Sequence, residues 1–521
     1  MALSTLSSAG LAVLRSYVLL VIYRLTFHPL ARYPGNFTDK ISSWPLIYQC
    51  YRGNRHLRIL EAHKKYGSVI RIAPDTLDFD TTTAMAAIHR DRNANVRKGA
   101  WYKTVDAETG TFSVQTVIDR KEHNFRRRIL EPAFSHSALR IQEHFIDNNV
   151  RVFLHEMGKD VQEDGWTTPK DFSQWITYFG FDFISDLAFG SCFRLLQSPE
   201  HRYLPDLLKW TSHFVYYAGY LPFAPLVRAV MGTSIMNHVP SQAARDTHKY
   251  YLEAESKLGE RSAAEEEAWS SGKEGRRDIF HYLFRTRDPE TNIGLSHEQL
   301  QADSGLLIAA GSDGVAVTVS AALFYLLHNS SSMAKLVHEI RSSFATLDDV
   351  RNPQMNRLPY LQAVIDESLR LAPSVLSAFP REVLRGGLNV DGLHVPVGMT
   401  VGVSGYAIHH NETYFPDSFA FRPERWLGDG ESVSLARSAL ITFGAGTYNC
   451  IGKNVAIAAA KLVLAKTIYA YDVKAARGKV TGGGGPAAGR GREREDEYQL
   501  LDYLVAYRSG PMVQFRTRNE K

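Results

Sequence analysis

Apolar residues recur at helical spacing through most of the chain, from about residue 80 to about residue 373, and segments such as 172–189 and 206–220 predict helices. Strand-like alternation is confined to short segments, 68–72 and 76–79 around a Pro-Asp turn and a series that begins at about Arg381. A polar run at 270–277 interrupts the helices, and the glycine-rich, then charged, stretch 482–494 predicts a solvated loop. The pattern predicts a mainly α protein with smaller β-sheets, an α+β fold.

The first 25 residues carry a different pattern. Residues 2–23 are mostly apolar over about the 20 residues that a spanning helix needs, with Arg15 near the middle. Arg24, His28 and Arg32 follow the apolar run, and no small-residue cleavage site appears, so the pattern favours an uncleaved membrane anchor over residues 1–25. The basic residues after the run favour the cytosolic side for the remaining domain, 26–521. The alternative is a buried N-terminal helix.

Composition narrows the class of protein. The 521 residues are 44% hydrophobic and 22% charged, which requires a large buried core. The formal charge is only +5 at pH 7, so no global electrostatic argument points to nucleic acid as a partner. Cys50, Cys192 and Cys450 are too few and too scattered for a disulfide framework or a cysteine-rich zinc site, which favours a reducing compartment.

The longest predicted helix lies just past the middle of the chain. Residues 296–299 have the form of a capping box, and the apolar pattern then runs without proline to about His328. A helix of roughly 32 residues is about 48 Å long. Its centre holds Gly311 and Gly314 on either side of Asp313. Each glycine costs about 0.5 to 1 kcal/mol relative to alanine, so the pair indicates either a flat ligand close to the backbone or close packing of another helix.

One cysteine has an unusual setting. The sequence 443–452, Phe-Gly-Ala-Gly-Thr-Tyr-Asn-Cys-Ile-Gly, places Cys450 behind a glycine-rich bend and ahead of a helix predicted from about Lys453 to Tyr469. Amide donors and the helix dipole at such a position lower the pKa of a thiol and favour the metal-binding thiolate. Taken alone, a cysteine before a helix is more often a small buried hydrophobe. The interpretation therefore depends on the surrounding motifs.

Several motifs in order resemble the cytochrome P-450 family of haem-thiolate enzymes, over nearly the whole chain from residue 34. The family's haem-binding loop matches here at Phe443, Gly444, Gly446, Cys450 and Gly452. The resemblance implies that Cys450 is the proximal ligand of the iron of haem b, iron protoporphyrin IX. It also implies the family's fold, with a long central helix and a cysteine-ligand loop, and a single haem-binding catalytic domain over residues 26–521.

An ion network is implied by two further segments. The sequence 367–370, Glu-Ser-Leu-Arg, matches the family's Glu-x-x-Arg helix, and 421–426, Phe-Arg-Pro-Glu-Arg-Trp, matches the later segment whose arginine joins that pair. A lone Glu-x-x-Arg is usually a surface pair, but both segments occur here in the right order with the cysteine loop. A buried charged set is costly unless its members satisfy one another, so we interpret the network as structural.

The haem propionates need cationic donors, and the resemblance supplies three. His123 and Arg127 share a helical face and match the family's Trp-or-His-x-x-x-Arg pair. Arg381 matches the arginine that follows the Glu-x-x-Arg helix. Tyr448 departs from the pattern, because many relatives carry a propionate-binding arginine there, although a phenol still donates a hydrogen bond.

The implied reaction is insertion of one oxygen atom from O2, with Asp313 as the acid in proton delivery. The alcohol that usually follows this acid is missing, because Gly314 stands where the family usually has threonine. Thr318, one turn further on, could act only through a water. Ordered water or a substrate hydroxyl could relay the proton, the enzyme could run another reaction, or oxygen activation could be poor. The alternatives are a haem-thiolate isomerase or dehydratase and a weakly catalytic haem-binding protein.

The resemblance also implies partners and a location. No Rossmann unit follows a strand, so electrons from NADPH would come through a separate NADPH-cytochrome reductase. The closest likeness is to microsomal members from filamentous fungi, which implies the endoplasmic reticulum membrane, a single pass, a cytosolic catalytic domain and an apolar small-molecule substrate such as a secondary metabolite. The segment 374–379 is expected to line the substrate pocket.

Overall fold

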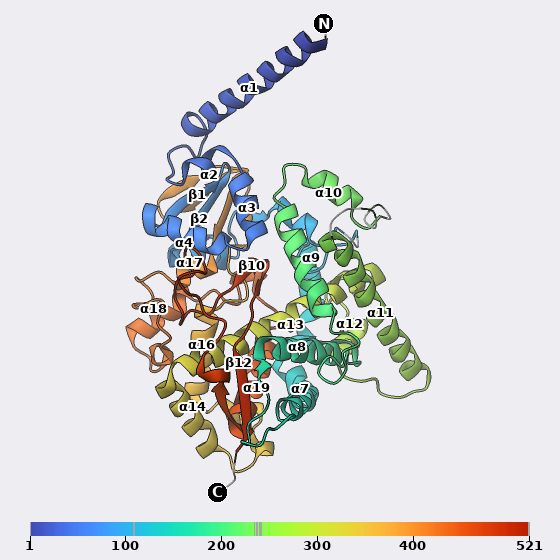
Figure 1. Cartoon of the computed structure of the whole chain (residues 1–521). Coiled ribbons are helices and arrows are strands. Elements are labelled where there is room, and N and C mark those ends of the chain that lie inside the picture. The colour runs from blue at the N-terminus through green and yellow to red at the C-terminus, as the bar shows by residue number, and fades with distance from the viewer. Residues whose placement is uncertain (1, 108–109, 234, 236–237, 239–241, 519–521) are drawn as a thin grey trace.

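Helices dominate the computed structural model, which describes residues 2–107, 110–233, 235, 238 and 242–518 (Figure 1). The α-helices are α1 (Ala2–Thr26), α2 (Phe37–Ile41), α3 (Trp44–Arg52), α4 (Arg55–Tyr66), α5 (Thr82–Met85), α6 (Arg120–Leu130), α7 (His136–Met157), α8 (Phe172–Phe189), α9 (Leu204–Ala218), α10 (Ala224–Val230), α11 (Gln242–Ser270), α12 (Ile279–Arg285), α13 (His297–His328), α14 (Ser330–Ser343), α15 (Asn352–Met355), α16 (Pro359–Leu371), α17 (Gly405–His409), α18 (Glu431–Ala439) and α19 (Lys453–Ala470). The short helical turns include η1 (Ala86–Arg90), η2 (Ala100–Thr104), η3 (Glu131–Phe134), η5 (Leu347–Asp349), η6 (Pro423–Trp426), η7 (Gly446–Tyr448) and η8 (Ala476–Gly478).

The strands form small sheets at the edges of the helical body. They are β1 (Val69–Ala73), β2 (Thr76–Phe79), β3 (Val96–Lys98), β4 (Lys170–Asp171), β5 (Arg381–Val383), β6 (Leu388–Val390), β7 (Leu393–Val395), β8 (Thr400–Val403), β9 (Tyr471–Ala475), β10 (Leu501–Tyr503), β11 (Val505–Tyr507) and β12 (Met512–Thr517). The largest sheet has the order β1-β2-β8-β5-β3, in which β2 and β8 are parallel and Leu77 pairs with Val401. The predicted α+β class and the predicted pairing of β1 with β2 are confirmed.

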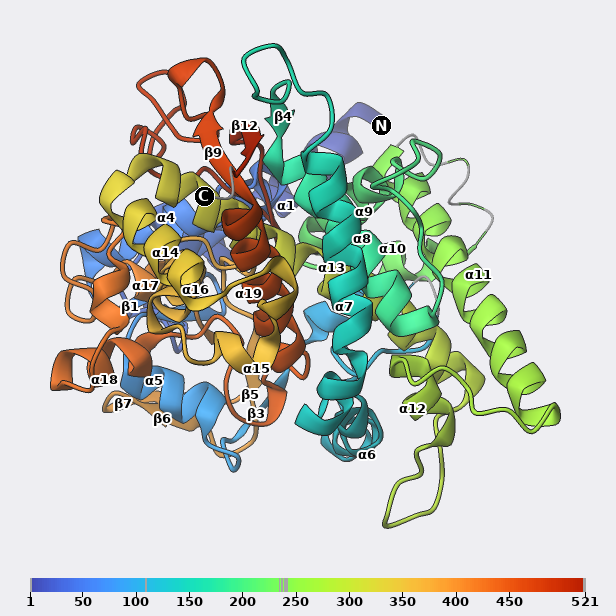
Figure 2. The same ribbon diagram turned by 90° about the horizontal axis from the view of Figure 1, so that it is seen from below.

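Helix α13 runs through the centre of the molecule and packs against α8, α16 and α19 (Figure 2). Ser296 caps it through the predicted capping box with Gln299, and the helix ends at His328 as predicted. Its crossing with α8 is very close, since a Cβ atom on Gly180 or on Gly311 would overlap the other helix, at the Ser312 carbonyl or the Ile184 side chain. Gly311 is therefore explained by helix packing, which is one of the two predicted alternatives.

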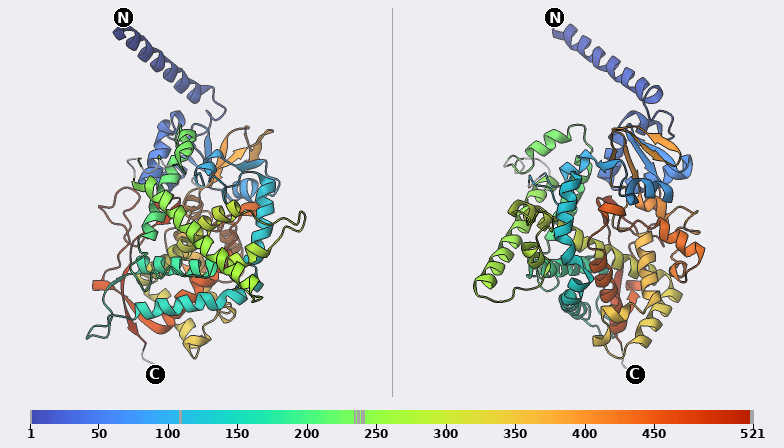
Figure 3. Two further views of the ribbon diagram at one scale, coloured as in Figure 1. Left: turned by 90° about the vertical axis from the view of Figure 1, so that its right-hand side faces the viewer. Right: turned by 180° about the vertical axis from the view of Figure 1, so that it is seen from behind.

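Helix α1 projects away from the rest of the molecule in every side view (Figures 1 and 3). Its described side chains include exposed apolar residues from Leu11 to Tyr23. Among the described residues, the single helix that is long and apolar enough to cross a membrane by composition is α13, and about two thirds of its most apolar window, 67%, is buried. Helix α13 is thus a core helix, and the anchor assigned to residues 1–25 stays a prediction.

The two irregular stretches also lie where the sequence predicts them. Helix α11 ends at Ser270, where the polar run 270–277 begins. The stretch 482–494 has no helix or strand, but it is closed on itself, because Gly484 N donates to Arg494 O at 2.8 Å and Gly485 N to Arg492 O at 2.9 Å. The loop is therefore more tightly held than its composition indicates.

Candidate active site

The loop that carries Cys450 is folded by its own backbone. It lies between α18 and α19, and Cys450 N donates to Phe443 O at 2.8 Å, which closes the loop into a ring. Arg127 of α6 clamps it from outside: Nη1 donates to Asn449 O at 2.6 Å and Nη2 to Asn449 Oδ1 at 2.8 Å. Its Nε donates to Glu131. The guanidinium of Arg127 thus holds the residue immediately before the cysteine.

The Cys450 thiol is accessible, although protein atoms crowd around it. Its side chain keeps accessible surface, yet burial raises the pKa of the thiol above its ordinary value. The predicted lowering of this pKa is therefore wrong for the free thiol, because burial outweighs the hydrogen bond from the Gly452 backbone and the positive charge of Arg127.

Two glycines in the loop predict unequal effects of the same substitution. Gly444 and Gly446 have φ of 66° and 62°, where alanine is strained by about 1 to 2 kcal/mol. A Cβ atom on Gly446 would also overlap the carbonyl oxygen of His89, whereas one on Gly444 would meet its nearest neighbour at 3.4 Å. We expect Gly446→Ala to lower the free energy of unfolding clearly more than Gly444→Ala, as measured by urea denaturation. Equal losses would show that η7 does not depend on its contact with η1.

Helix α13 presents an open side at its centre. Ala310 is exposed and Asp313 and Gly314 are half-buried, although most residues from Leu300 to Leu326 are buried. Among the described residues beyond the adjacent turns of α13, a Cβ atom on Gly314 would meet a single atom within 4 Å, Ser374 Oγ at 3.9 Å. Gly314 therefore leaves room on its side of the helix, unlike Gly311, and a flat ligand close to the backbone stays a prediction for this position.

Asp313 is paired with an arginine from the C-terminal part of the chain. Arg508 Nη1 lies 3.7 Å from Asp313 Oδ1, and Arg508 Nη2 donates to Thr177 Oγ1 at 2.8 Å. Burial raises the pKa of Asp313, and the charge of Arg508 offsets part of that rise. A polar cavity of about 150 Å³ between α8, α9 and β11 is lined by Thr177, Lys209, Asp313, Ala506 and Arg508, among others.

The Thr318 hydroxyl is hydrogen-bonded within α13. Its side chain is buried, with 4% of the residue exposed, and Oγ1 donates to Gly314 O at 2.8 Å. The structure thus places Asp313, Gly314 and Thr318 on one stretch of α13, as predicted, but the Thr318 proton is engaged by the backbone.

Three buried basic side chains surround the Tyr448 ring. His123 meets it edge-on with ring centroids 4.7 Å apart, Arg381 lies 4.9 Å from its centroid and Lys98 lies 4.8 Å from it. Burial lowers the pKa of His123 to about 3, and Lys98 adds to this effect. Burial and the charge of Arg381 hold the pKa of Lys98 well below its ordinary value. A positive charge on these side chains is therefore costly unless an anion lies beside them.

Some buried nitrogen atoms in and near this group have no hydrogen-bond partner among the described residues. Arg381 Nη1 donates to Tyr102 at 2.7 Å, but within the described parts of the chain the buried Nε of Arg381 and the buried Nε2 of His89 have no hydrogen-bond partner. Buried basic side chains and buried donors without partners call for an anion. A haem fits this set, because its propionates are anionic, Cys450 offers a sulfur ligand, and Gly314 leaves space on the helix.

Lys98, Tyr102 and His89 were not predicted as site residues. Lys98 ends the short strand β3, and its Nζ donates to Val114 O at 3.0 Å. Neither its spacing nor its neighbours in sequence distinguish it from a surface lysine. Only the pairing of β3 with β5, which sets Lys98 opposite Arg381, brings it to the site.

Replacing Lys98 with methionine should weaken haem retention. A charge-assisted hydrogen bond contributes about 1.5 to 3 kcal/mol, so we expect the haem to leave roughly 10- to 150-fold faster when transferred to an excess of a haem-binding acceptor. The matched control is Lys466→Met. Lys466 is equally buried, but it is paired with Asp147 on α7.

These two variants should separate binding from folding. The Lys466→Met substitution removes one ion-pair partner of Asp147. It should lower the free energy of unfolding without a specific effect on the rate of haem loss. In haem-free protein the pKa of Lys98 is lower in the folded than in the unfolded chain, where it is about 10.4. Between these two pKa values the unfolded chain binds more protons, so the free energy of unfolding of the wild type rises with pH. The Lys98→Met variant should show a flatter profile. Faster haem loss from the Lys466 variant alone would exclude Lys98 from propionate binding.

The Glu-x-x-Arg pair forms the predicted network. Glu367 accepts two bonds of 2.9 Å from Arg370, one from Arg425 Nε, one from Trp426 Nε1 and one from the backbone of Arg422, each also 2.9 Å. Glu367 and Arg370 are fully buried. Burial alone would raise the pKa of Glu367, but the charge and hydrogen bonds of Arg370 outweigh it and lower the pKa. The network fastens η6 to α16.

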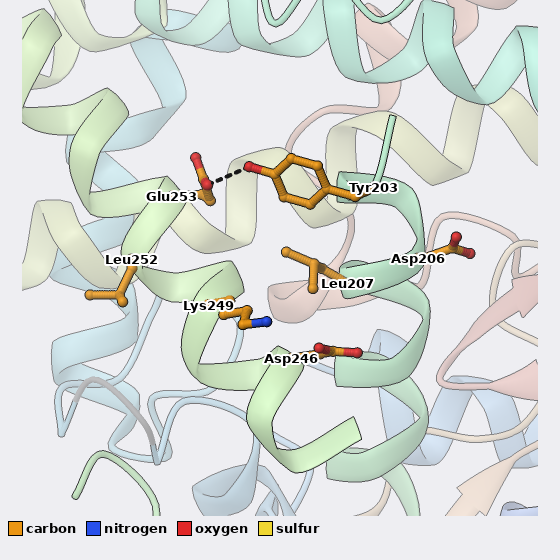
Figure 4. A pocket seen from close by; sticks show the side chains of 7 residues that line it. All are labelled: Tyr203, Asp206, Leu207, Asp246, Lys249, Leu252 and Glu253. Carbon is orange, nitrogen blue, oxygen red and sulfur yellow. Dashed lines mark hydrogen bonds between the residues drawn. The ribbon is translucent and has the colours of Figure 1, made fainter. Parts of the chain in front are cut away.

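A larger cavity, of about 550 Å³, lies between α9 and α11 (Figure 4). It is lined by Tyr203, Asp206, Leu207, Asp246, Lys249, Leu252 and Glu253. Tyr203 donates to Glu253 at 2.6 Å across it. None of the predicted site residues lines this cavity, so it is not the candidate active site.

Comparison with known proteins agrees with this geometry. The sequence model of the family described as cytochrome P-450 matches residues 40–481. The chain is 35% identical to cytochrome P-450 monooxygenase fscF of Fusarium equiseti, over 96% of the chain and 94% of that protein. It is 34% identical to cytochrome P-450 monooxygenase AKT7 of Alternaria alternata, over 95% and 94%, and 32% identical to cytochrome P-450 monooxygenase apf7 of Gibberella fujikuroi, over 96% and 96%.

Proposed function

Since the chain belongs to the cytochrome P-450 family and is a monooxygenase by that membership, we propose that it inserts one oxygen atom of O2 into an apolar small molecule, a secondary metabolite. The observation that carries the proposal is an accessible thiol at Cys450 together with two buried basic side chains, Lys98 and Arg381, that lie over Tyr448 of the same loop. Relatives of this chain are named as monooxygenases of three fungi, which supports a fungal metabolite as the substrate class.

Each site residue has a proposed role. The haem, which we propose is haem b, supplies the activation of O2 when bound. Cys450 is its sulfur ligand, held by the ring that Phe443 closes, with Gly444, Gly446 and Gly452 letting the backbone pass close. His123, Arg381 and Lys98 hold the propionates, and Arg127 fixes the loop through Asn449.

Asp313 delivers a proton at the open face of α13, where burial raises the pKa of its carboxyl and Arg508 lies beside it. Gly314 leaves the space in which a substrate or an ordered water lies. Thr318 supports the helix backbone at that point through its bond to Gly314 O.

The membrane and electron-transfer roles complete the proposal. Residues 1–25 form a single-pass anchor in the endoplasmic reticulum membrane, and residues 26–521 form one haem-binding catalytic domain on the cytosolic side. The support is the row of exposed apolar side chains on the projecting helix α1 and the basic residues after it. Family members receive electrons from a redox partner, and we propose that NADPH-cytochrome reductase is the partner here.

Isotopic oxygen tests the proposal. The purified protein, a fungal NADPH-cytochrome reductase and NADPH are incubated under ¹⁸O2 with an extracted metabolite pool, and products are analysed by mass spectrometry. We expect a new product that carries one labelled oxygen. A new product without label would favour the isomerase or dehydratase, whereas NADPH consumption without any product would favour a weakly catalytic haem-binding protein.

A further inference from the structure

A hydroxyl from another segment of the chain lies close to Gly314, on the side where another residue would carry its side chain. Among the described residues beyond the adjacent turns of α13, Ser374 Oγ is the single atom within 4 Å of the position that a Gly314 Cβ would take, at 3.9 Å. It also donates to Gly314 O, at 3.4 Å. Ser374 follows the proline that ends α16, so this hydroxyl reaches α13 from a segment 60 residues further along the chain.

The position of Ser374 is fixed by its neighbours. Ala506 N of β11 donates to Ser374 O at 2.9 Å, and Tyr406 N donates to Leu376 O at 2.8 Å. The segment is thus held to β11 on one side and to α17 on the other. Ser374 itself is half-buried, so its side chain keeps accessible surface at the open face of α13.

The two hydroxyls near Gly314 differ in how firmly they are engaged. The Thr318 bond to Gly314 O is short, 2.8 Å, and its side chain is buried. The Ser374 bond to the same oxygen is long, 3.4 Å, and bonds of this length are weak. Ser374 can therefore rotate toward another acceptor at low cost, whereas Thr318 cannot.

The acid precedes Gly314 in sequence, and it lies near the strand that holds Ser374. Asp313 lines the polar cavity of about 150 Å³. Ala506, which holds Ser374, lines the same cavity, and its carbonyl lies 3.5 Å from Arg508, the partner of Asp313. The acid, its cation and the hydroxyl are thus arranged around one turn of α13 and one strand.

We propose that Ser374 supplies, from the segment after α16, the hydroxyl that α13 lacks at Gly314, and that it holds the water through which a proton from Asp313 reaches the substrate side of the haem. The Ser374 hydroxyl gives up its proton toward the substrate side and takes a proton from the bound water. That water takes a proton from the Asp313 carboxyl. A proton from bulk solvent, passed along the cavity water, restores the Asp313 carboxyl. No electrons move, and the hydroxyl is restored. The proposal rests on the proposed monooxygenase function.

Removal and relocation of the hydroxyl test the proposal. In Ser374→Ala we expect the C–O stretching band of the carbon monoxide complex to shift and to lose its sensitivity to D2O, because a hydrogen-bond donor has left the ligand pocket. The ratio of product to NADPH should fall at least about tenfold, as for loss of a positioned proton donor. Ser374→Thr keeps a hydroxyl and should retain both properties. The double variant Gly314→Thr/Ser374→Ala should regain them, because the hydroxyl returns from the helix.

Ser312→Ala is the matched control. Its hydroxyl lies on the same helix but donates to Ile308 O at 2.8 Å on the side that packs against α8. This variant should leave the band and the ratio unchanged. An unchanged band in Ser374→Ala, with an unchanged product ratio, would overturn the role of Ser374 while leaving the proposed function intact. If the wild type gives no labelled product, the proposed function fails, and a band shift confined to Ser374→Ala would still place this hydroxyl in the ligand pocket.

Discussion

Replacing Cys450 with serine is expected to abolish the red-shifted thiolate band in the carbon monoxide difference spectrum of the dithionite-reduced protein. Serine has nearly the same size and keeps the loop's backbone bond to Phe443, so the loop should still close. An alkoxide or hydroxyl oxygen does not push electron density onto iron as a thiolate does, and the band reports that donation. NADPH-dependent product formation should fall below detection in the same variant.

The control for Cys450→Ser is Cys192→Ser. Cys192 lies in the turn after α8, is also partly accessible and has a pKa raised by burial, but its sulfur accepts a bond from Arg194 N and its thiol is hydrogen-bonded to Asp182. The Cys192 variant should keep the full band. A band retained by a folded, haem-loaded Cys450→Ser variant would exclude Cys450 as the ligand and would undo the central assignment of the site.

The parts of this site that the sequence predicts are those encoded locally. The capping box at 296–299 and the unbroken apolar run to His328 are properties of neighbouring residues, and α13 follows them residue for residue. The cysteine loop is likewise local, because its glycines, its cysteine and the following helix are adjacent in the chain.

The parts that the sequence does not predict come from pairings between distant segments. Lys98 reaches the group of basic side chains through the pairing of β3 with β5, and Arg508 reaches Asp313 from the C-terminal hairpin. The sign of the Cys450 pKa shift was missed for the same reason, since burial is a tertiary property. Gly311 and Gly314 look alike in sequence, and only the position of α8 shows that one serves packing and the other leaves space.

The second large effect is expected from Glu367→Gln, which should lower the free energy of unfolding by about 3 to 5 kcal/mol, with a corresponding loss of haem-loaded protein. Glutamine nearly keeps the shape of the side chain, so the change is mainly electrostatic. It leaves the buried guanidinium of Arg370 and that of Arg425 without their shared anion, and it replaces an acceptor oxygen by a donor amide. Urea denaturation followed by circular dichroism, together with the haem-to-protein ratio, measures both losses.

The neighbouring carboxyl provides the control and a test by pH. Asp366 lies on the same helix, but its nearest cation, Arg437, is 3.6 Å away and half exposed, and burial raises the pKa of Asp366. Asp366→Asn should therefore be neutral or slightly stabilising at pH 7. Because the pKa of Glu367 is lowered on folding, its contribution is complete above the unfolded value of about 4.3 and is lost as pH falls through the folded value. The stability gap between the wild type and Glu367→Gln should thus close in acid, and a gap independent of pH would show that the loss comes from packing rather than from charge.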